Sequence, residues 1–357
     1  MGEVVSNKLL TSFRGCRVLI TGHTGFKGSW LAFMLHEAGA EVLGYALPPP
    51  QEKNHFSLLG LSKKIKHIEA DMRDADKICN VMKEFKPEFV FHLAAQALVK
   101  SSYIDPKLTF DTNISGSVNL LEAIRKTDSV RSLIFVTSDK CYENNDWIWG
   151  YRENDQLGGH DPYSASKAAA ELVFSAYSRS YFSKQNELGA ASARAGNVIG
   201  GGDWSLDRII PDCIRAIESG NKIQLRNPNA TRPWQHLLEP LSGYMLLAIS
   251  LLDEPKKYSG SWNFGPSTDG VKSVLDVTKH IMNKFNYKGV EIKASDTNEH
   301  EANLLQLNCD KAKQLLNWKP KWNTEQALDA TAVWYKEIAQ GTDACDVTRK
   351  QILDYFG

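Results

Sequence analysis

The stretch "CRVLITGHTGFKGSWLAFMLHEAG", residues 16–39, decides the fold of this chain. Its first residues, "CRVLIT", predict a short buried strand, and "SWLAFMLHEAG" predicts a helix that ends at Gly39. Between them stand Gly22, Gly25 and Gly28, with the spacing GxxGxxG. Glycines between a strand and a helix let a pyrophosphate approach the backbone at the positive end of the helix. The stretch therefore favours a dinucleotide site over a plain glycine-rich turn.

The residues around this turn bear on the choice of cofactor. We expect further contacts to the dinucleotide from the same turn, namely Thr24, Phe26 and Lys27. The acid that commonly binds the ribose after the second strand is absent, because "GYALPPP" offers only Tyr45 and three prolines. This segment therefore does not distinguish NAD from NADP. Asp71, after the third strand, is expected to accept from the adenine amino group, with Met72 packed on the ring.

Strand and helix patterns alternate through the first half of the chain. The apolar runs predict strands and the amphipathic runs predict helices, with strands at 41–47, 66–70, 88–94 and 130–137 and helices at 74–85 and 114–126. Strands that alternate with helices pair in parallel through right-handed crossovers. The chain is therefore predicted to form a doubly wound parallel α/β sheet of the Rossmann type.

The pattern changes after about Ala195, where glycine, proline and tryptophan become frequent. Helical patterns return at 274–285 and 324–338, and the uncharged run at 241–252 predicts a core helix, because it is too short to span a bilayer. We expect a smaller, mixed α/β C-terminal domain that binds the substrate. The predicted division assigns residues 1–194 and a return segment of about 235–256 to the Rossmann domain, and 195–234 with 257–357 to the substrate domain.

The composition excludes several classes of partner. The 357 residues include 42 lysines and arginines and 42 aspartates and glutamates, so there is no broad basic field for nucleic acid or anionic lipid. The six cysteines show no CxxC pair, which favours free thiols in a reducing compartment and argues against a metal site. The start "MGEVVS" matches a myristoylation pattern but has no second anchor. Asn113 and Asn229 match the glycosylation sequon, but no secretory signal precedes them. A cytoplasmic protein without membrane attachment is expected.

The motif "YSASK" places Tyr163 and Lys167 one turn apart on one face of a predicted helix. A tyrosine, with a pKa of about 10, becomes a useful base at neutral pH only if that pKa drops by about 3 units. A cation about 4 Å away supplies roughly this much, so Lys167 suffices in principle. Taken alone, the pair is also a common pattern of ordinary helices.

The stretch "VTSDKCYEN", residues 136–144, places Asp139 beside Lys140 where the strand predicted at 130–137 ends. A carboxyl group and an amine at such a place offer an acid and a base within a few ångströms. The alternative is a salt bridge in which each side chain only neutralises the other.

These motifs occur in the order of a known family. The glycine-rich turn, "FHLAAQ", "TNISG", "VTSDK" and "YSASK" resemble the extended short-chain dehydrogenase/reductases, in the group of NAD-dependent epimerases and dehydratases, over nearly the whole chain. The resemblance implies the Rossmann fold, NAD as cofactor and a homodimer. The stretches "TSDKCY", "WIWGYREN", "RAGNVIGGGDW" and "RPWQHLLEPLSGY" resemble nucleotide-sugar dehydratases and imply CDP-glucose as substrate, in deoxysugar biosynthesis for lipopolysaccharide O-antigen.

The resemblance also implies roles for the motif residues. Tyr163, aided by Lys167, takes the proton of the sugar 4-hydroxyl while a hydride passes from carbon 4 to NAD. Asp139 is the acid for the departing 6-hydroxyl, Lys140 occupies the position of the base at carbon 5, and Ser138 hydrogen-bonds the 4-oxygen. Hydride return to carbon 6 yields a 4-keto-6-deoxy sugar. Relatives carry Asp-Glu where this chain has Asp-Lys, and a lysine with a pKa of about 10.4 must lose its proton to act as a base.

The remaining expected contacts lie in loops that follow the strands. For the cofactor they are Leu93, Ala94 and Ala95, and for the substrate they are Gln96, Asn197, Trp204, Arg208, Arg226, Arg232 and His300. The arginines suit a diphosphate, although each one alone is also typical of a solvated surface charge. Trp204 suits cytosine stacking and, equally, the core. His92 and His236 are interpreted as packed, hydrogen-bonded histidines.

Two other kinds of function remain open. A nucleotide-sugar epimerase, or a dehydratase for GDP-mannose or dTDP-glucose, shares the oxidation at carbon 4 and differs in its product. A dinucleotide-sensing protein without catalysis shares only the fold. Its mark is loss of the tyrosine or lysine of YxxxK, and both are present here.

Overall fold

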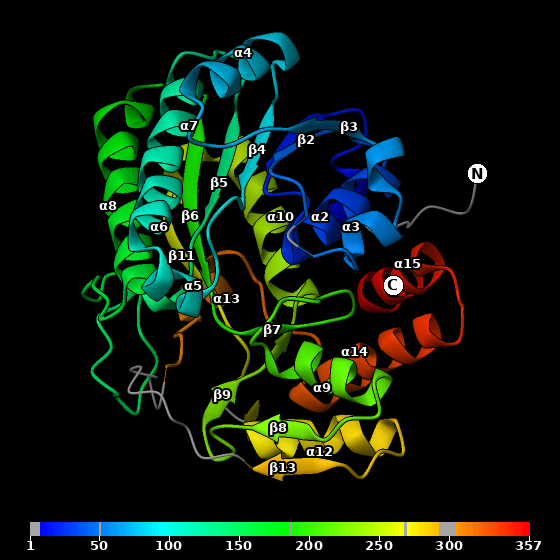
Figure 1. Cartoon of the computed structure of the whole chain (residues 1–357). Helices are drawn as coiled ribbons and strands as arrows, with labels where there is room; N and C mark the ends of the chain where they lie inside the picture. Colours follow the sequence, from blue (N-terminus) through cyan, green and yellow to red (C-terminus); the bar gives the residue numbers. More distant parts are fainter. Residues whose placement is uncertain (1–7, 50, 186, 268–269, 293–304) are drawn as a thin grey trace.

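One parallel sheet forms the centre of the computed structural model, which describes residues 8–49, 51–185, 187–267, 270–292 and 305–357 (Figure 1). Within these ranges, its seven strands lie in the order β3 (Lys66–Glu69), β2 (Glu41–Ala46), β1 (Arg17–Thr21), β4 (Phe89–His92), β5 (Ser132–Val136), β6 (Gly189–Ala195) and β11 (Gly260–Phe264). All neighbouring strands are parallel. The order reverses between β1 and β4, which confirms the predicted doubly wound Rossmann fold.

Each central strand contributes to two hydrophobic cores, because successive side chains of a strand point to opposite faces of the sheet. In β1, Val18 and Ile20 belong to one core and Leu19 to the other. In β5, Ile134 and Leu133 divide in the same way. Such strands have no solvent-facing side, which explains why they read as continuous apolar runs in the sequence.

Helices cover both faces of the sheet (Figure 1). On one face lie α2 (Phe26–Glu37) and α10 (Leu238–Asp253), and on the other lie α4 (Ala75–Phe85), α7 (Gly116–Arg125) and α8 (Pro162–Ser180). The helices predicted at 74–85, 114–126 and 241–252 are confirmed, with small differences at their ends. No helix within the described ranges has the length and apolar character needed to cross a membrane.

Short strand pairs and helices form the smaller lobe, in the lower part of Figure 1, and confirm its mixed α/β character. The strand pairs are β7 (Val198–Ile199) with β10 (Gln235–His236), β9 (Thr231–Pro233) with β12 (Val271–Ser273), and β8 (Ile223–Leu225) with β13 (Val290–Ile292). The C-terminal half also contains helices α9 (Ile209–Glu218), α12 (Val274–Lys284), α13 (Asp310–Leu315), α14 (Thr324–Ala339) and α15 (Ala344–Phe356). Shorter helices lie in the connections, at α1 (Lys8–Thr11), α3 (His55–Leu58), α5 (Val99–Ile104), α6 (Pro106–Phe110) and α11 (Pro255–Tyr258).

The structure corrects the predicted division into domains. β11 lies within residues 257–357, which the sequence pattern assigns to the substrate domain, yet it pairs with β6 and completes the central sheet. The C-terminal helix α15 likewise packs beside α3, where the His55 ring hydrogen-bonds to Thr348 at 3.2 Å. Both contacts join residues far apart in the chain, so no local sequence pattern predicts them.

The glycine-rich turn brings backbone segments unusually close together. Gly22 has a φ of +77°, and a Cβ there would lie 2.6 Å from the backbone nitrogen of Ala94. Helix α2 begins at Phe26 rather than at the predicted Ser29, which places Gly28 in its first turn. A Cβ at Gly28 would lie 2.1 Å from the carbonyl oxygen of Gly22. Glycine at these positions therefore lets β1, α2 and the loop after β4 meet.

We expect Gly28→Ala to lower the free energy of unfolding by about 1–3 kcal/mol, the usual cost of overpacking, and to weaken dinucleotide binding. Urea unfolding and a binding titration measure the two effects. Gly25→Ala is the matched control, because a Cβ there would lie 3.3 Å from the Gly22 carbonyl and its φ of −76° suits alanine. Equal stability of the two variants would contradict the packing argument.

Candidate active site

Ser138, Asp139 and Lys140 lie just beyond the carboxyl end of β5, as predicted. Ser138 caps the short 3₁₀ helix η3 (Asp139–Cys141), because its hydroxyl accepts from the Lys140 amide at 3.2 Å and donates to the Asp139 carboxylate at 2.9 Å. Asp139 is only 5% exposed. A Cβ at Gly196 would lie 3.0 Å from its carboxylate, so the glycine leaves room for this side chain. The predicted acid is therefore buried and held by its neighbours.

Tyr163 and Lys167 lie on the first two turns of α8, and both are almost fully buried. Asp161 fixes the start of the helix by accepting from the Ser164 amide at 2.9 Å. The Ser138 side chain is close enough to Tyr163 to lower the pKa of its hydroxyl, against the larger effect of burial. Ser138 therefore joins the acid of the β5 segment to the tyrosine of α8, and the structure brings together the residues predicted for catalysis.

Burial is the largest influence on the ionisation of these groups. It raises the pKa of Asp139, although the charge of Lys140 and the hydrogen bond from Ser138 oppose it. Burial also raises the pKa of Tyr163 to about 12 and lowers the pKa of Lys167 to about 8. The prediction that Lys167 brings the tyrosine pKa below its ordinary value is wrong for the chain by itself. Desolvation outweighs the opposing effects, and the cation that lowers the pKa of Tyr163 is Arg208.

Asp139 and Lys140 do not form a salt bridge with each other in the part of the chain that the structure describes. The carboxylate accepts from Ser138, and the charges of Lys140 and Lys27 act on it without a direct ion pair. The alternative interpretation, in which the two side chains only neutralise each other, is therefore not supported.

Cationic side chains gather around Asp139. Burial is the main cause that lowers the pKa of Lys27, in the first turn of α2, to about 8. The charges of Arg208 and Lys167 lower this pKa as well, and the charge of Asp139 opposes them. Arg208 forms a salt bridge with Asp203 at 2.9 Å, which is the main cause that raises its pKa. This concentration of positive charge suits an anionic ligand, although the chain as a whole is neutral.

The predicted cofactor residues fit a dinucleotide. Gly25 precedes α2 without a side-chain cap, so the amides of the first turn remain available to a pyrophosphate. Thr24 donates to the Leu47 carbonyl at 2.8 Å and thereby ties the turn to the segment after β2. Phe26 packs against the core beside it. At the switch point between β1 and β4, where doubly wound sheets bind their ligands, lie Leu93, Ala94 and Ala95.

Asp71 and Met72, the residues predicted to contact the adenine, make contacts within the protein instead. The Arg73 guanidinium forms an ion pair with the Asp71 carboxylate at 2.6 Å, and its hydrogen bonds lower the pKa of that carboxyl. Met72 is 4% exposed and packs close to Gly116. The structure therefore does not support Met72 as an open stacking surface for adenine, and Asp71 would have to share its carboxylate with Arg73.

Gln96 and Asn197 lie in loops at the carboxyl edge of the sheet. The Gln96 side chain is held within its own loop, where it accepts from the Leu98 amide at 2.6 Å and donates to Thr109 at 2.9 Å. Asn197 is half-buried between β6 and β7. Their contacts to a substrate stay predictions.

The predicted phosphate-binding arginines are not equivalent. Arg208 lies close to the residues predicted for catalysis, because its charge lowers the pKa of Tyr163. Arg226 is more exposed and forms a salt bridge with Asp207 at 2.7 Å. Arg232, on β9, donates to the Thr231 carbonyl at 2.8 Å. Arg208 therefore has the strongest structural case for substrate contact.

Trp204 is a core residue, which favours the second of its two predicted roles over a contact with the nucleobase. It is 6% exposed and packs edge-on against Trp334 and Tyr335, with ring centroids 5.6 and 5.4 Å away. These rings come from α14, so only the packing of distant elements shows that the indole is enclosed.

The histidines have different positions. His92 is buried, and its ring hydrogen-bonds to Thr21 at 2.7 Å and Ser117 at 3.3 Å, which confirms a packed, hydrogen-bonded histidine. His236 is also buried, and burial lowers its pKa to about 3. His300, predicted to reach the substrate, lies outside the described residues.

Some residues that organise the site are not among the site residues predicted from the sequence. Asn113, in the π-helical turn η2 (Asp111–Ser115), donates to Ser166 of α8 at 2.8 Å. Glu171 and Arg194 form a buried salt bridge behind the catalytic residues. The only signal for Glu171 is its spacing of four residues from Lys167, which places both on one face of α8.

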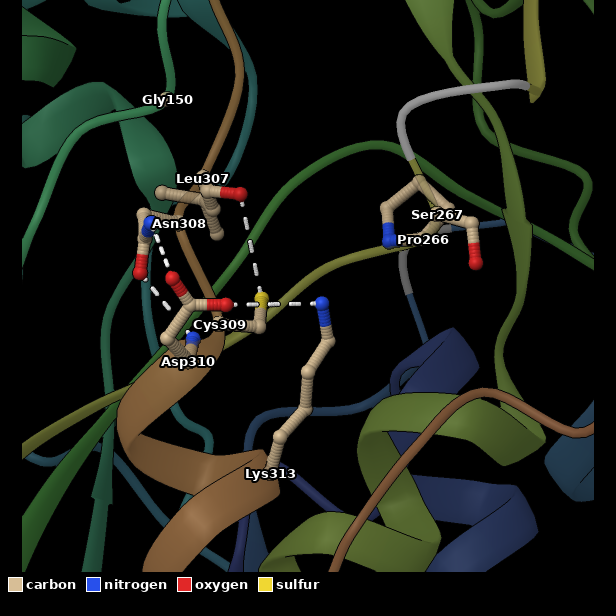
Figure 2. Close-up of a pocket in the computed structure, with 8 residues that line it drawn as sticks. All are labelled: Gly150, Pro266, Ser267, Leu307, Asn308, Cys309, Asp310 and Lys313. Atoms are coloured by element: carbon tan, nitrogen blue, oxygen red, sulfur yellow. Dashed lines mark hydrogen bonds and ion pairs between the residues drawn. The ribbon is translucent and has the colours of Figure 1, made fainter.

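A cavity of about 310 Å³ opens beside the carboxyl end of β11 (Figure 2). It is lined by Gly150, Pro266, Ser267, Leu307, Asn308, Cys309, Asp310 and Lys313. Lys313 and Asp310 form an ion pair across one wall at 3.6 Å. The Cys309 thiol accepts from the Gly265 amide at 3.0 Å. The predicted catalytic residues are not among those that line it.

We expect Asp139→Asn to be more stable than the wild-type protein at pH 8, by about 0.5–2 kcal/mol, the range of stabilising substitutions at strained sites. Because folding raises the pKa of Asp139, the stability that this group contributes is full at low pH and is lost as the pH rises through the folded pKa. The gain should therefore shrink as the pH falls toward about 4, the ordinary aspartate pKa. Urea unfolding at both pH values measures it, with the exposed Asp354→Asn as control. A pH-independent difference would contradict the burial of a charged carboxyl group.

Comparison with known proteins identifies the family of the chain. The family described as GDP-mannose 4,6 dehydratase matches residues 19–331. The CDP-glucose 4,6-dehydratase of Salmonella typhimurium is 44% identical over 348 residues, which cover 96% of this chain and 97% of that protein.

Solved structures of related enzymes share the fold. The dTDP-glucose 4,6-dehydratase of Streptomyces venezuelae, with NAD and TYD bound, has a TM-score of 0.76 at 22% identity and covers 92% of this chain and 99% of its own. The UDP-glucose 4-epimerase of Thermus thermophilus, in complex with NAD, has a TM-score of 0.76 at 25% identity, with 90% and 99% covered. The chain therefore belongs to the GDP-mannose 4,6-dehydratase family, within the extended short-chain dehydrogenase/reductases.

Proposed function

We propose that this protein is an NAD-dependent CDP-glucose 4,6-dehydratase, which converts CDP-D-glucose to CDP-4-dehydro-6-deoxy-D-glucose with loss of water. The observation that carries the proposal is a buried group in which Ser138 hydrogen-bonds to Asp139 beside Tyr163. Lys140 and Lys167 lie next to this group in the chain. The 44% identity to the Salmonella typhimurium enzyme over almost the whole chain supports CDP-glucose as the substrate.

The glycine-rich turn and the uncapped start of α2 would hold the pyrophosphate of NAD. Bound NAD supplies the acceptor for the hydride of carbon 4 and later the donor of that hydride to carbon 6. Related enzymes solved with NAD bound support this choice of cofactor.

The oxidation at carbon 4 requires a base for the 4-hydroxyl proton. Tyr163 takes this proton, and Ser138, which lies close enough to act on the tyrosine, is placed to bind the 4-oxygen. The chain raises the pKa of Tyr163 to about 12 mainly by burial, so the phenolate depends on positive charge near it. Arg208 provides part of that charge.

The elimination requires an acid at the 6-hydroxyl and a base at carbon 5. Asp139 suits the acid, because burial raises its pKa and favours the protonated form that can donate to the leaving oxygen. Lys140 stands where related dehydratases carry the base, and it contributes its own charge beside the acid. The two tasks fall to adjacent residues, which keeps both groups near the reacting carbons.

A 4-epimerase is the rival that shares most of this site. Epimerases share the oxidation by tyrosine and NAD but do not need an acid beside a base for elimination. The buried, raised-pKa Asp139 next to Lys140 therefore favours a dehydratase. A non-catalytic dinucleotide sensor is disfavoured because a complete set of acid and base groups is assembled.

We also propose that the protein acts in the cytoplasm as a homodimer. Its six cysteines are free thiols, which suits a reducing compartment. Apolar side chains are exposed on the neighbouring helices α5, α6 and α8, which stand side by side in Figure 1: Ile104 (85%), Leu172 (61%) and Leu108 (38%). Such a patch on adjacent helices suits a helical interface with a second copy.

Light scattering should give the wild-type protein twice the mass of one chain at micromolar concentration. Leu172→Glu should give a single chain, because it places a charge in the apolar contact. Leu353→Glu, at an exposed leucine of α15, is the matched control and should leave the dimer intact. A wild-type monomer, or a Leu172→Glu dimer, would reject this interface.

Incubation with NAD and CDP-glucose in heavy water, followed by mass spectrometry and NMR, tests the proposed activity. We expect a product that has lost one water and carries a single deuterium at carbon 5, because the 5-proton is exchanged and the hydride returns internally. A 4-epimer would contradict the dehydratase, and turnover of dTDP-glucose, UDP-glucose or GDP-mannose but not of CDP-glucose would contradict the substrate.

In the same assay, Lys140→Ala should lower the dehydration rate by about 100- to 10,000-fold, the usual contribution of an acid or base, with NAD binding unchanged. The exposed Lys288→Ala serves as the control variant. Wild-type turnover by Lys140→Ala would remove Lys140 from the mechanism.

A further inference from the structure

A buried ion pair lies directly behind the catalytic residues. Arg194, on β6, and Glu171, on α8, approach to 2.7 Å, and their side chains are only 2% and 1% exposed. Glu171 lies one turn beyond Lys167 and two turns beyond Tyr163, on the same face of the helix. Neither residue is placed to contact a substrate, and each makes several further hydrogen bonds.

Glu171 holds one end of the segment that carries the acid. Its carboxylate accepts a short hydrogen bond from the hydroxyl of Thr137, the residue before Ser138. The other carboxylate oxygen accepts from Ser192 at 2.8 Å and from Arg194. The start of the Ser138 segment is therefore attached to the helix that carries Tyr163.

Arg194 holds the other end of the same segment. Its guanidinium donates to the hydroxyl of Tyr142, the residue after η3, at 2.7 Å, and lies 4.9 Å from the centre of the Tyr142 ring. It also donates to the Glu153 carbonyl at 3.0 Å and to Ser261 of β11 at 3.0 Å. Tyr142 in turn donates to Asn263 of β11 at 2.8 Å. Residues 138–141 are thus attached on both sides to one charged pair.

A buried ion pair is a poor source of stability, because the cost of desolvating both charges offsets their attraction. Here, the pair is connected to both ends of the catalytic segment and to the catalytic helix, which is the arrangement needed to hold reacting groups at fixed positions. A misplacement of about 1 Å at such groups lowers a rate roughly 100-fold.

We propose that Glu171 and Arg194 are positioning residues for the dehydration, which hold Ser138, Asp139 and Lys140 in register with Tyr163 and Lys167. The inference rests on the proposed function, because it assigns the pair a role in that reaction. Glu171 acts through Thr137 and through Lys167, and Arg194 acts through Tyr142.

The charge of Glu171 adds a second effect, on Lys167. The ionisable groups that face this lysine are Cys141 of η3, Glu171 of its own helix, Lys27 of α2 and His92 of β4. Burial lowers the pKa of Lys167 to about 8, while Cys141 and Glu171 raise it. Removal of the carboxylate charge therefore lowers the lysine pKa further, and the ammonium form is lost at a lower pH.

Steady-state kinetics of Glu171→Gln across pH 6 to about 9 test the proposal. We expect kcat to fall about 100-fold, KM to change less than about threefold, and the alkaline limb of the kcat profile to move to lower pH. Arg194→Lys keeps a positive charge beside Glu171 but loses the second guanidinium nitrogen, which donates to the Tyr142 hydroxyl. It should lower kcat without moving the alkaline limb, and it provides a second test if Glu171→Gln does not fold.

Glu239→Gln is the matched control. Glu239 is another fully buried carboxylate, which accepts from the Trp322 amide at 2.8 Å and from the Tyr355 hydroxyl at 2.6 Å, away from the catalytic segment. It should lose stability in urea while kcat stays near the wild-type value. Unchanged kcat in both Glu171→Gln and Arg194→Lys, or an equal loss in Glu239→Gln, would overturn the positioning role.

The assay uses the nucleotide sugar that the wild-type protein turns over in the heavy-water experiment. Wild-type inactivity toward CDP-glucose with activity toward another nucleotide sugar would reject the proposed substrate, and the variants would then be compared on that sugar. Active wild-type protein with unimpaired variants would reject only the positioning role.

Discussion

Removal of water from charged side chains at the carboxyl edge of the sheet is the constraint on which this site depends. Desolvation is the largest cause of the pKa shift in Asp139, Tyr163, Lys167 and Lys27. It favours a protonated acid and an uncharged amine, and it opposes the phenolate that the oxidation step needs. Positive charge from Arg208 opposes that last effect. The parallel sheet is what makes such burial possible, because both of its faces are covered.

Buried charge also needs a frame that holds it. The chain surrounds the catalytic segment with groups that are themselves buried and paired, above all Glu171 and Arg194. Thr137 and Tyr142 connect this pair to the two ends of the segment. Ser138 donates a hydrogen bond to Asp139, and its side chain also lowers the pKa of Tyr163. The catalytic geometry is in this way distributed over β5, β6, β11 and α8, elements that only the sheet order brings together.

The parts that the sequence predicts well are those with a local cause. The glycine spacing of Gly22, Gly25 and Gly28 follows from one turn, and the i and i+4 spacing of Tyr163 and Lys167 follows from one helix. The parts that it predicts poorly depend on distant contacts. Trp204 is enclosed by rings of α14, Met72 is covered at Gly116, and β11 joins the sheet through pairing with β6.

The sequence by itself determined the alternation of strands and helices, the glycine-rich turn, and the proposed acid, amine and tyrosine as candidates, because each depends on residues close together in the chain. The tertiary structure alone decided how those groups ionise and what holds them. Burial raises the pKa of Tyr163 although Lys167 lies one turn away, and Glu171 meets Arg194 across 23 positions of chain. Solvent exclusion and long-range contacts are properties of the packed fold, so no local pattern of residues encodes them.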